Sequence, residues 1–112
     1  MMFDEYTKNQ IIRGRKIVTR RLRKNNQRPA TPNNIHKIKI DRTPRVYGYI
    51  QILSVEKGTL GKLTILDAKL EGFNNKEDYL EYFKSVNGTR AINTPIWIIK
   101  FKYLPNKNLM EE

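Results

Sequence analysis

The segment IWIIKFKYL, residues 96–104, constrains the fold of this chain more than any other stretch. Every second residue in it is large and apolar, and a period of two places such residues on one face of a β-strand. We expect this face to pack into the core, because aromatic stripes in strands usually point inward. The residues on that face are Trp97, Ile99, Phe101 and Tyr103.

A second strand is predicted over residues 46–56, VYGYIQILSVE, where apolar side chains again alternate. Gly48 interrupts that pattern, and a glycine inside a strand marks a bulge or a close approach of another part of the chain. The following KGTLGK is rich in glycine and lysine and predicts a turn or an irregular connection.

The basic first half of the chain predicts two more strands. Residues 15–24 contain an Ile-Val-Thr run whose β-branched side chains favour extended structure. Alternation puts Thr19 and Arg21 on one face of this strand and Lys16 and Arg20 on the other.

Residues 25–34, NNQRPATPNN, predict a loop, because two prolines forbid a regular ladder. Residues 35–41, IHKIKID, predict a short strand with one exposed face.

A first helix is predicted over residues 4–14. Asp4 is a suitable N-cap and Gly14 a suitable stop. The spacing of Tyr6 and Ile11 assigns them to the inner face, with Gln10 beside them.

Two further helices are predicted over residues 64–72 and 76–86. The first begins with Thr-Ile-Leu-Asp, a capping-box pattern, and Asn75 is a suitable N-cap for the second. An Asn-Gly pair at 87–88 stops the last helix.

This order of elements predicts a mixed α+β fold with a small barrel-like sheet. At 112 residues the chain has the size of one domain. We assign that domain to residues 1–104 and a polar C-terminal tail to residues 105–112.

Charge is the strongest indication of function. The chain has 22 Lys and Arg residues against 11 acids, which gives a formal net charge of +11. Such an excess attracts polyanions, and phosphate backbones are the commonest of these. The alternative is that the basic surface binds no polyanion and only promotes solubility. A membrane partner is not expected, because the acidic, polar start MMFDEYT is no basic amphipathic helix and no lipidation box ends the sequence.

Several kinds of chemistry are excluded or unsupported. The absence of cysteine rules out disulfides, thiol catalysis and cysteine-ligated zinc. A lone histidine, His36, and scattered acids predict no metal site, and neither a P-loop nor a dinucleotide fingerprint is present, so no cofactor is expected. No apolar run approaches the roughly 20 residues that span a bilayer. Without a recognisable signal peptide, the expected location is the cytoplasm.

Two stretches of the sequence resemble the ASCH domain of the PUA-like superfamily. The first is IRGRKIVTRR, residues 12–21, which matches a helix ending in a Gly-x-Lys turn followed by Thr-x-Arg on a strand. The second comprises DAKLEGF at 67–73, KEDYLEYF at 76–83 and PIWIIKF at 95–101. The resemblance covers roughly residues 8 to 104, and the Pro/Asn-rich loop departs from the Gly-Asp turn common in the family.

The resemblance implies a β-barrel of five or six strands flanked by two or three short helices, with a cleft between them. Some ASCH members hydrolyse the amide of N4-acetylcytidine through a Lys, a Thr and a Glu. The motif positions correspond to Lys16, Thr19 and Glu71, and Arg21 matches an arginine expected to line the same cleft.

The residues themselves leave this catalytic reading open. Lys16 can act as a base if burial and nearby arginines lower its pKa, while Thr19 supplies a hydroxyl and Glu71 carries a proton to the leaving amine. In the alternative reading Lys16 and Arg21 hold phosphate and Glu71 pairs with one of them. A metal-independent ribonuclease using the same residues is a further possibility without specific support.

The basic run and the tyrosines after it predict a nucleic-acid surface, because a charged strand can track a phosphate backbone. Tyr47 and Tyr49 can stack bases, although packing against the barrel wall explains them equally well. The predicted binding residues are Arg13, Arg15, Lys16, Arg20, Arg21, Arg23, Lys24, Arg28, Lys37, Lys39, Arg45, Tyr47 and Tyr49, with Arg42 close by.

RNA binding is the function that we favour, with an amidohydrolase acting on acetylated nucleosides as the alternative. DNA remains a possible partner. However, the two predicted helices over 64–72 and 76–86 carry too many acids to enter a major groove. The default oligomeric state is a monomer.

Overall fold

Three α-helices, four strands and a short 3-10 helix make up the computed structural model, which describes residues 1–106. The elements are α1 (Glu5–Ile12), β1 (Val18–Leu22), β2 (Ile35–Lys37), β3 (Tyr49–Thr59), η1 (Leu60–Lys62), α2 (Ile65–Leu70), α3 (Lys76–Asn87) and β4 (Pro95–Leu104). From residue 107 onward, the predicted polar tail lies outside the described residues.

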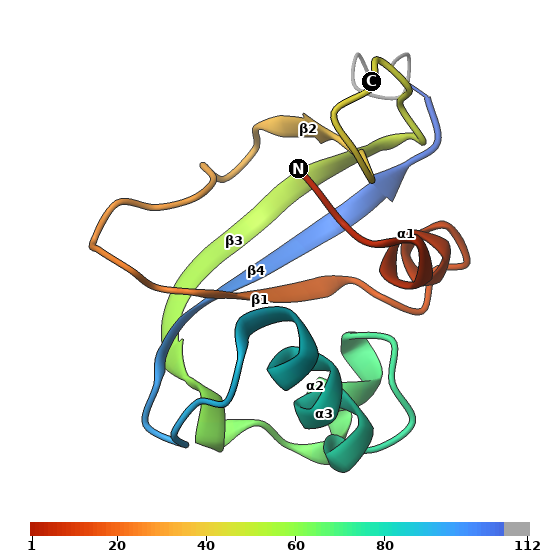
Figure 1. The fold of residues 1–112 in the computed structure, drawn as a ribbon. Helices are drawn as coiled ribbons and strands as arrows, with labels where there is room; N and C mark the ends of the chain where they lie inside the picture. Colours follow the sequence, from red (N-terminus) through yellow and green to blue (C-terminus); the bar gives the residue numbers. More distant parts are fainter. Residues whose placement is uncertain (107–112) are drawn as a thin grey trace.

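The four strands form one antiparallel sheet in the order β1-β4-β3-β2. The sheet curls into a half-barrel, and Figure 1 shows α1 above β1 and the pair α2 and α3 below it. The predicted α+β class with a small PUA-like barrel is therefore confirmed, although the described residues form a half-barrel of four strands rather than the five or six that the resemblance implies. Because β1 stands at an edge of the sheet, one side of its backbone has no neighbouring strand among residues 1–106.

The N-terminal segment continues the curl beyond β2. Met2 forms an isolated parallel bridge with Lys39, and the Phe3 N–H donates to the Lys39 carbonyl oxygen at 2.8 Å. From the opposite edge of the sheet, the Arg21 guanidinium donates to the Met2 carbonyl oxygen, also at 2.8 Å. A side chain, rather than a ladder of backbone hydrogen bonds, thus links β1 to this segment.

The core lies on both sides of β4. As predicted, Trp97, Ile99 and Phe101 are buried together inside the curl, and Tyr103 packs half-buried against them. The other face of the same strand is buried as well, since a second cluster joins Ile96 to apolar residues of η1, α2 and α3. This second core fixes the two C-terminal helices against the sheet.

The second long strand lies three residues later than predicted, because β3 begins at Tyr49 and continues through Thr59. Gly48 precedes it with φ of +129°, and a Cβ there would lie 2.8 Å from the Tyr103 ring. The close approach predicted for this glycine is therefore confirmed. The KGT segment predicted as a turn is strand instead, since it pairs with the start of β4.

The predicted helix caps are confirmed. The Asp4 carboxylate accepts a hydrogen bond from the Thr7 N–H, and Thr64 and Asp67 form a complete capping box. Gly14 follows α1 with φ of +76°. The assignment of Tyr6 to the inner face of α1 is wrong, because the residue is 48% exposed, and Thr7 and Lys8 are buried instead.

Candidate functional site

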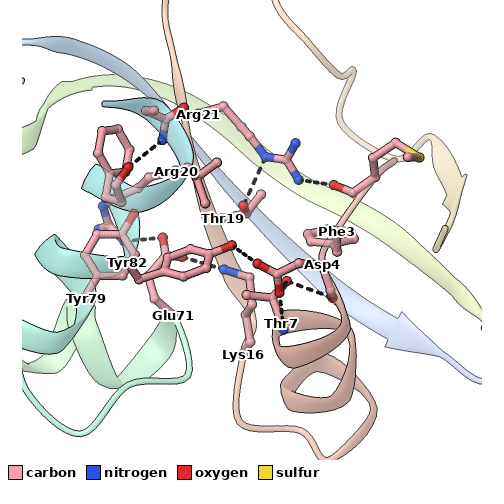
Figure 2. A pocket seen from close by; sticks show the side chains of 14 residues that line it. Phe3, Asp4, Thr7, Lys16, Thr19, Arg20, Arg21, Glu71, Tyr79 and Tyr82 are labelled. Carbon is pink, nitrogen blue, oxygen red and sulfur yellow. Dashed lines mark hydrogen bonds and ion pairs between the residues drawn. The ribbon is translucent and has the colours of Figure 1, made fainter. Parts of the chain in front are cut away.

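A pocket of about 290 Å³ lies along β1, between α1 and the pair α2 and α3 (Figure 2). Its volume is at the lower limit of typical small-molecule sites, about 300–1,000 Å³. The lining residues are Met2, Phe3, Asp4, Thr7, Lys16, Thr19, Arg20, Arg21, Glu71, Tyr79, Tyr82, Phe83, Val86 and Asn87.

The position of β1 at the edge of the sheet explains why three consecutive residues line one pocket. Thr19 and Arg21 pair with Ile99 and Trp97, whose side chains lie inside the curl, whereas Arg20 pairs with Ile98 on the helix side. Side chains from both faces of an edge strand can reach past its open side. The alternation predicted for this strand is therefore present, yet all three side chains line the same pocket.

A buried ion cluster occupies the floor of the pocket. Lys16 Nζ lies 2.5 Å from Glu71 Oε1, and Arg20 donates to Glu71 Oε2 at 2.9 Å. Arg20 also reaches Asp67 at 3.4 Å. Lys16 and Glu71 are only 2% and 1% exposed, so both charges have been taken almost completely out of water. An ion pair that deep contributes to stability only if its geometry is good and its remaining hydrogen-bonding groups are satisfied.

Backbone contacts bring Lys16 and Glu71 together. The two residues form an isolated antiparallel bridge, and the Ile17 N–H donates to the Leu70 carbonyl oxygen at 2.9 Å. Beside this bridge Gly72 has φ of +93°, and a Cβ there would lie 3.0 Å from Gln10. The Glu-Gly sequence therefore lets the end of α2 approach the turn that leaves α1.

Burial lowers the pKa of Lys16 below its ordinary value. The Glu71 carboxylate opposes that shift, and the nearby Arg21 and Arg20 guanidinium groups reinforce it. A lysine in this environment gives up its proton more easily than one in water.

A second group of contacts surrounds Arg21 at the side of the pocket away from Glu71 (Figure 2). Arg21 Nε donates to Thr19 Oγ1 at 3.2 Å, and its guanidinium lies 5.0 Å from the centre of the Phe3 ring. Burial lowers the pKa of Arg21, although a guanidinium stays protonated in proteins. The Thr19 hydroxyl thus accepts a hydrogen bond from an arginine of its own strand.

Asp4 and Tyr82 form the third polar contact in the pocket. The Tyr82 hydroxyl donates to Asp4 Oδ2 at 2.7 Å, and the Thr7 hydroxyl and N–H donate to Oδ1. Burial raises the pKa of Asp4, but these hydrogen bonds outweigh it, so the pKa lies below its ordinary value. Burial and the contact with Asp4 raise the pKa of Tyr82, and burial beside Glu71 raises that of Tyr79.

The structure separates the predicted site residues into two groups. Lys16, Thr19, Glu71, Arg20 and Arg21 line the pocket. The remaining predicted cations lie outside it and are exposed, apart from the half-buried Arg23 and Lys39. These are Arg13, Arg15, Arg23, Lys24, Arg28, Lys37, Lys39 and Arg45, together with Arg42.

The two predicted stacking tyrosines also lie outside the pocket. Tyr47 precedes β3, and its ring contacts both Lys8 and Arg45 at 4.7 Å from the ring centre. Tyr49 is half-buried and pairs with Leu104 on the sheet.

Sequence reasoning missed nine residues of the pocket, among them Asp4, Thr7, Tyr79 and Tyr82. Asp4 was predicted only as a helix cap, and Tyr79 lies within the helix predicted over residues 76–86. Tyr82 gave no local signal, since its contact with Asp4 joins residues 78 positions apart.

A second cavity, also of about 290 Å³, lies between η1 and α3, and we call it the α3 groove. Apolar side chains line it, and cations stand at its rim. Its residues are Leu60, Gly61, Leu63, Lys76, Leu80, Phe83, Lys84, Gly88, Thr89, Arg90 and Ile92.

Residues 1–106 contain no cluster of three or more His, Asp or Glu side chains able to hold a metal ion. Within the same range, no helix is both long and apolar enough to cross a bilayer.

Comparison with known proteins supports the architecture. No protein-family model matches the sequence, and no curated protein is similar to it. Solved structures are similar, however. The ASCH domain from Lactobacillus crispatus JV V101 has a TM-score of 0.68 at 18% identity, over 90% of this chain and 74% of that one.

Two other solved structures have a similar fold. ASCH from Zymomonas mobilis gives a TM-score of 0.61 at 18% identity, over 99% of this chain and 75% of that chain. A protein from Enterococcus faecalis V583 assigned to DUF984 gives 0.68 at 15% identity, over 88% and 69% of the two chains.

The curled sheet with its flanking helices thus has a small α+β fold of the PUA-like type. More narrowly, its fold is that of the ASCH domains, as the sequence resemblance predicted.

Proposed function

We propose that this chain is an RNA-binding ASCH protein whose backbone-binding cations stand at both ends of the pocket. Arg13 and Arg15 are exposed just before Lys16, and Lys24 is exposed just after β1, beside the half-buried Arg23. None of the four has an acidic partner within 4 Å among the described residues. A fully extended segment from residue 15 to 23 would span about 26 Å at the rise per residue of a strand. A single strand of RNA lying along this segment would contact cations at both ends of the segment, with the pocket between them.

Charge and aromatic lining together support RNA over other polyanions. Specific RNA recognition targets unpaired bases, which stack on aromatic side chains once they leave the helix. Tyr79, Tyr82 and Phe3 line the pocket beside its cations. A base inserted there would leave its phosphates on the flanking arginines.

The test is a salt series of binding to a short RNA containing an unpaired loop and to a DNA duplex of matched length. Each lost phosphate contact should reduce the salt slope by about 0.7 for a single strand. Charge reversal of Arg13, Arg15, Arg23 and Lys24 together should therefore flatten it by about 2.8. The matched control reverses Lys76 and Lys84 at the α3 groove and should leave it unchanged. Affinity for RNA that does not change with salt would refute the proposal.

A second function, hydrolysis of an acylated amine, is supported by one specific observation. The pocket contains a buried lysine with a lowered pKa, 2.5 Å from a carboxylate, on the same surface as a threonine hydroxyl. In this scheme neutral Lys16 accepts the Thr19 proton while the oxygen attacks the acyl carbon, and Arg21 stabilises the resulting oxyanion. Glu71 passes the proton to the departing amine, and water then releases the acyl group from Thr19.

Incubation with N4-acetylcytidine tests this scheme directly, with cytidine and acetate as the expected products. Lys16→Ala and Thr19→Val should each abolish the reaction. Cleavage that survives Lys16→Ala would exclude the mechanism, and shortened RNA in a parallel incubation would point to a ribonuclease instead.

A further inference from the structure

The cations of the pocket differ in how their charges are balanced. Lys16 is paired with Glu71, and Arg20 with both Glu71 and Asp67. Arg21 has no carboxylate within 4 Å among the described residues, although it lines the same pocket. The remaining acid of the pocket, Asp4, is held by Thr7 and Tyr82 and forms no ion pair with Arg21.

Arg21 is nevertheless firmly positioned. Its Nε donates to Thr19 and its Nη2 to the Met2 carbonyl oxygen, while the Phe3 ring packs against the guanidinium. These are neutral partners, which orient the guanidinium without cancelling its charge. A guanidinium carries five N–H donors, so three of them are left without an acceptor in the described part of the chain.

A partly buried cation without an acid beside it is costly unless something negative joins it. Its planar fork matches the oxygens of phosphate and carboxylate, which it binds through two parallel hydrogen bonds. Since RNA is the proposed ligand, the group selected is phosphate. This step rests on the proposed function, whereas the unpaired charge does not.

We propose that Arg21 and the Thr19 hydroxyl form a phosphate subsite inside the pocket, separate from the Lys16–Glu71 pair. Arg21 lies toward the Met2–Phe3 segment, away from Glu71, so a ligand bound at both ends spans the pocket (Figure 2). The ligand class is accordingly a nucleotide bound through base and phosphate, rather than a neutral nucleoside. The phosphate belongs either to a free mononucleotide or to an RNA chain that passes through the site.

The first experiment titrates inorganic phosphate into the protein and follows the arginine Nε–H signals by NMR. We expect the Arg21 signal to move with a saturating curve, and we expect Arg21→Gln to lose the binding that it reports. Arg90→Gln, which replaces an arginine of the α3 groove outside the pocket, is the matched control and should behave as the unaltered protein does. Equal, non-saturating movement of all arginine signals would overturn the subsite. This readout needs no RNA, so it remains informative if the proposed function fails.

The second experiment compares cytidine, cytidine 5′-monophosphate and the dinucleotide CpC by calorimetry. One charge-assisted contact should make the monophosphate bind about tenfold more tightly than the nucleoside. Arg21→Gln should remove that preference while leaving cytidine affinity unchanged, and Arg21→Lys should retain part of it. The loss of cytidine affinity as well would indicate a merely structural role and overturn the proposal. Tighter binding of CpC than of the monophosphate would identify RNA as the source of the phosphate, and the reverse order a free nucleotide.

Discussion

The pocket beside β1 and the α3 groove have the same volume, about 290 Å³ each, and both contact Phe83. The two cavities differ in which side chains are buried around them. The pocket buries a lysine and a glutamate almost completely, whereas the groove keeps its cations at the rim and lines its floor with leucines. Volume alone therefore does not distinguish a binding site from a packing defect.

The difference in burial carries the functional argument. Apolar side chains around a groove cost nothing to place there, since they also complete the second core. Buried charges reduce stability unless their partners compensate, and such groups are concentrated where chemistry or binding requires them. The pocket is therefore the region that we propose as the functional site.

The largest expected effect tests this contrast at Glu71. Replacing Glu71 with Ala leaves Lys16 and Arg20 buried without their shared partner, which should cost about 3–5 kcal/mol of unfolding free energy. Leu80→Ala in the α3 groove, where the side chain is partly exposed, is the matched control and should cost about 1 kcal/mol or less. Urea denaturation measures both. Similar losses in the two variants would remove the distinction between the two regions.

The next effect concerns pH. Because the folded pKa of Lys16 lies below its unfolded value of 10.5, the unfolded chain binds more protons between those two values. Stability should therefore rise with pH through that window, by at most about 1.4 kcal/mol per pH unit. Measurements should stop near pH 9.5, since Tyr79 and Tyr82, whose pKa values are raised, act in the opposite direction above pH 10. Lys16→Met should flatten the rise, and an unchanged slope would show that Lys16 does not titrate in this range.

A smaller effect is expected at Tyr82. Tyr82→Phe removes the hydroxyl that donates to Asp4, at a cost of about 1 kcal/mol near neutral pH. The lowered pKa of Asp4 contributes stability that is present above its unfolded value of 3.8 and lost as pH falls through the folded one. The difference between the two proteins should therefore shrink in acid. Tyr6→Phe, whose hydroxyl donates to the Gly72 carbonyl oxygen, is the control and should show no such acid dependence.

The smallest effect belongs to the α3 groove. Ile92 is 79% exposed there, so Ile92→Ser should change the unfolding free energy by no more than about 0.5 kcal/mol. RNA affinity should stay unchanged as well. A clear loss of RNA binding in this variant would assign the groove, rather than the pocket, to the ligand.

Much of the fold could be predicted because its signals are local. Alternation identified the inward face of β4, and short polar patterns identified the caps at Asp4, Thr64 and Asn75. Each signal depends on residues that lie within one turn or a few strand positions of each other. The prediction failed at Tyr6, because the inner face of an eight-residue helix is decided by what packs against it.

Only part of the candidate site could be predicted from the sequence. Resemblance pointed to Lys16, Thr19 and Glu71, and the structure places all three in one pocket. Alternation along the predicted strand over residues 15–24 argued against that grouping, but Lys16 lies before β1 and forms an isolated bridge with Glu71. The neutral partners that leave Arg21 without a counter-charge had no sequence signal.

By itself, the sequence determined the element types, the caps, one face of the core and the excess of positive charge. The tertiary structure decided which of those charges are buried, paired or left for a ligand. Arg20 meets Glu71 across 51 positions and Tyr82 meets Asp4 across 78, and no local pattern encodes such separations. Burial and pairing set the energy of an ionisable group, and both exist only once distant segments have packed together.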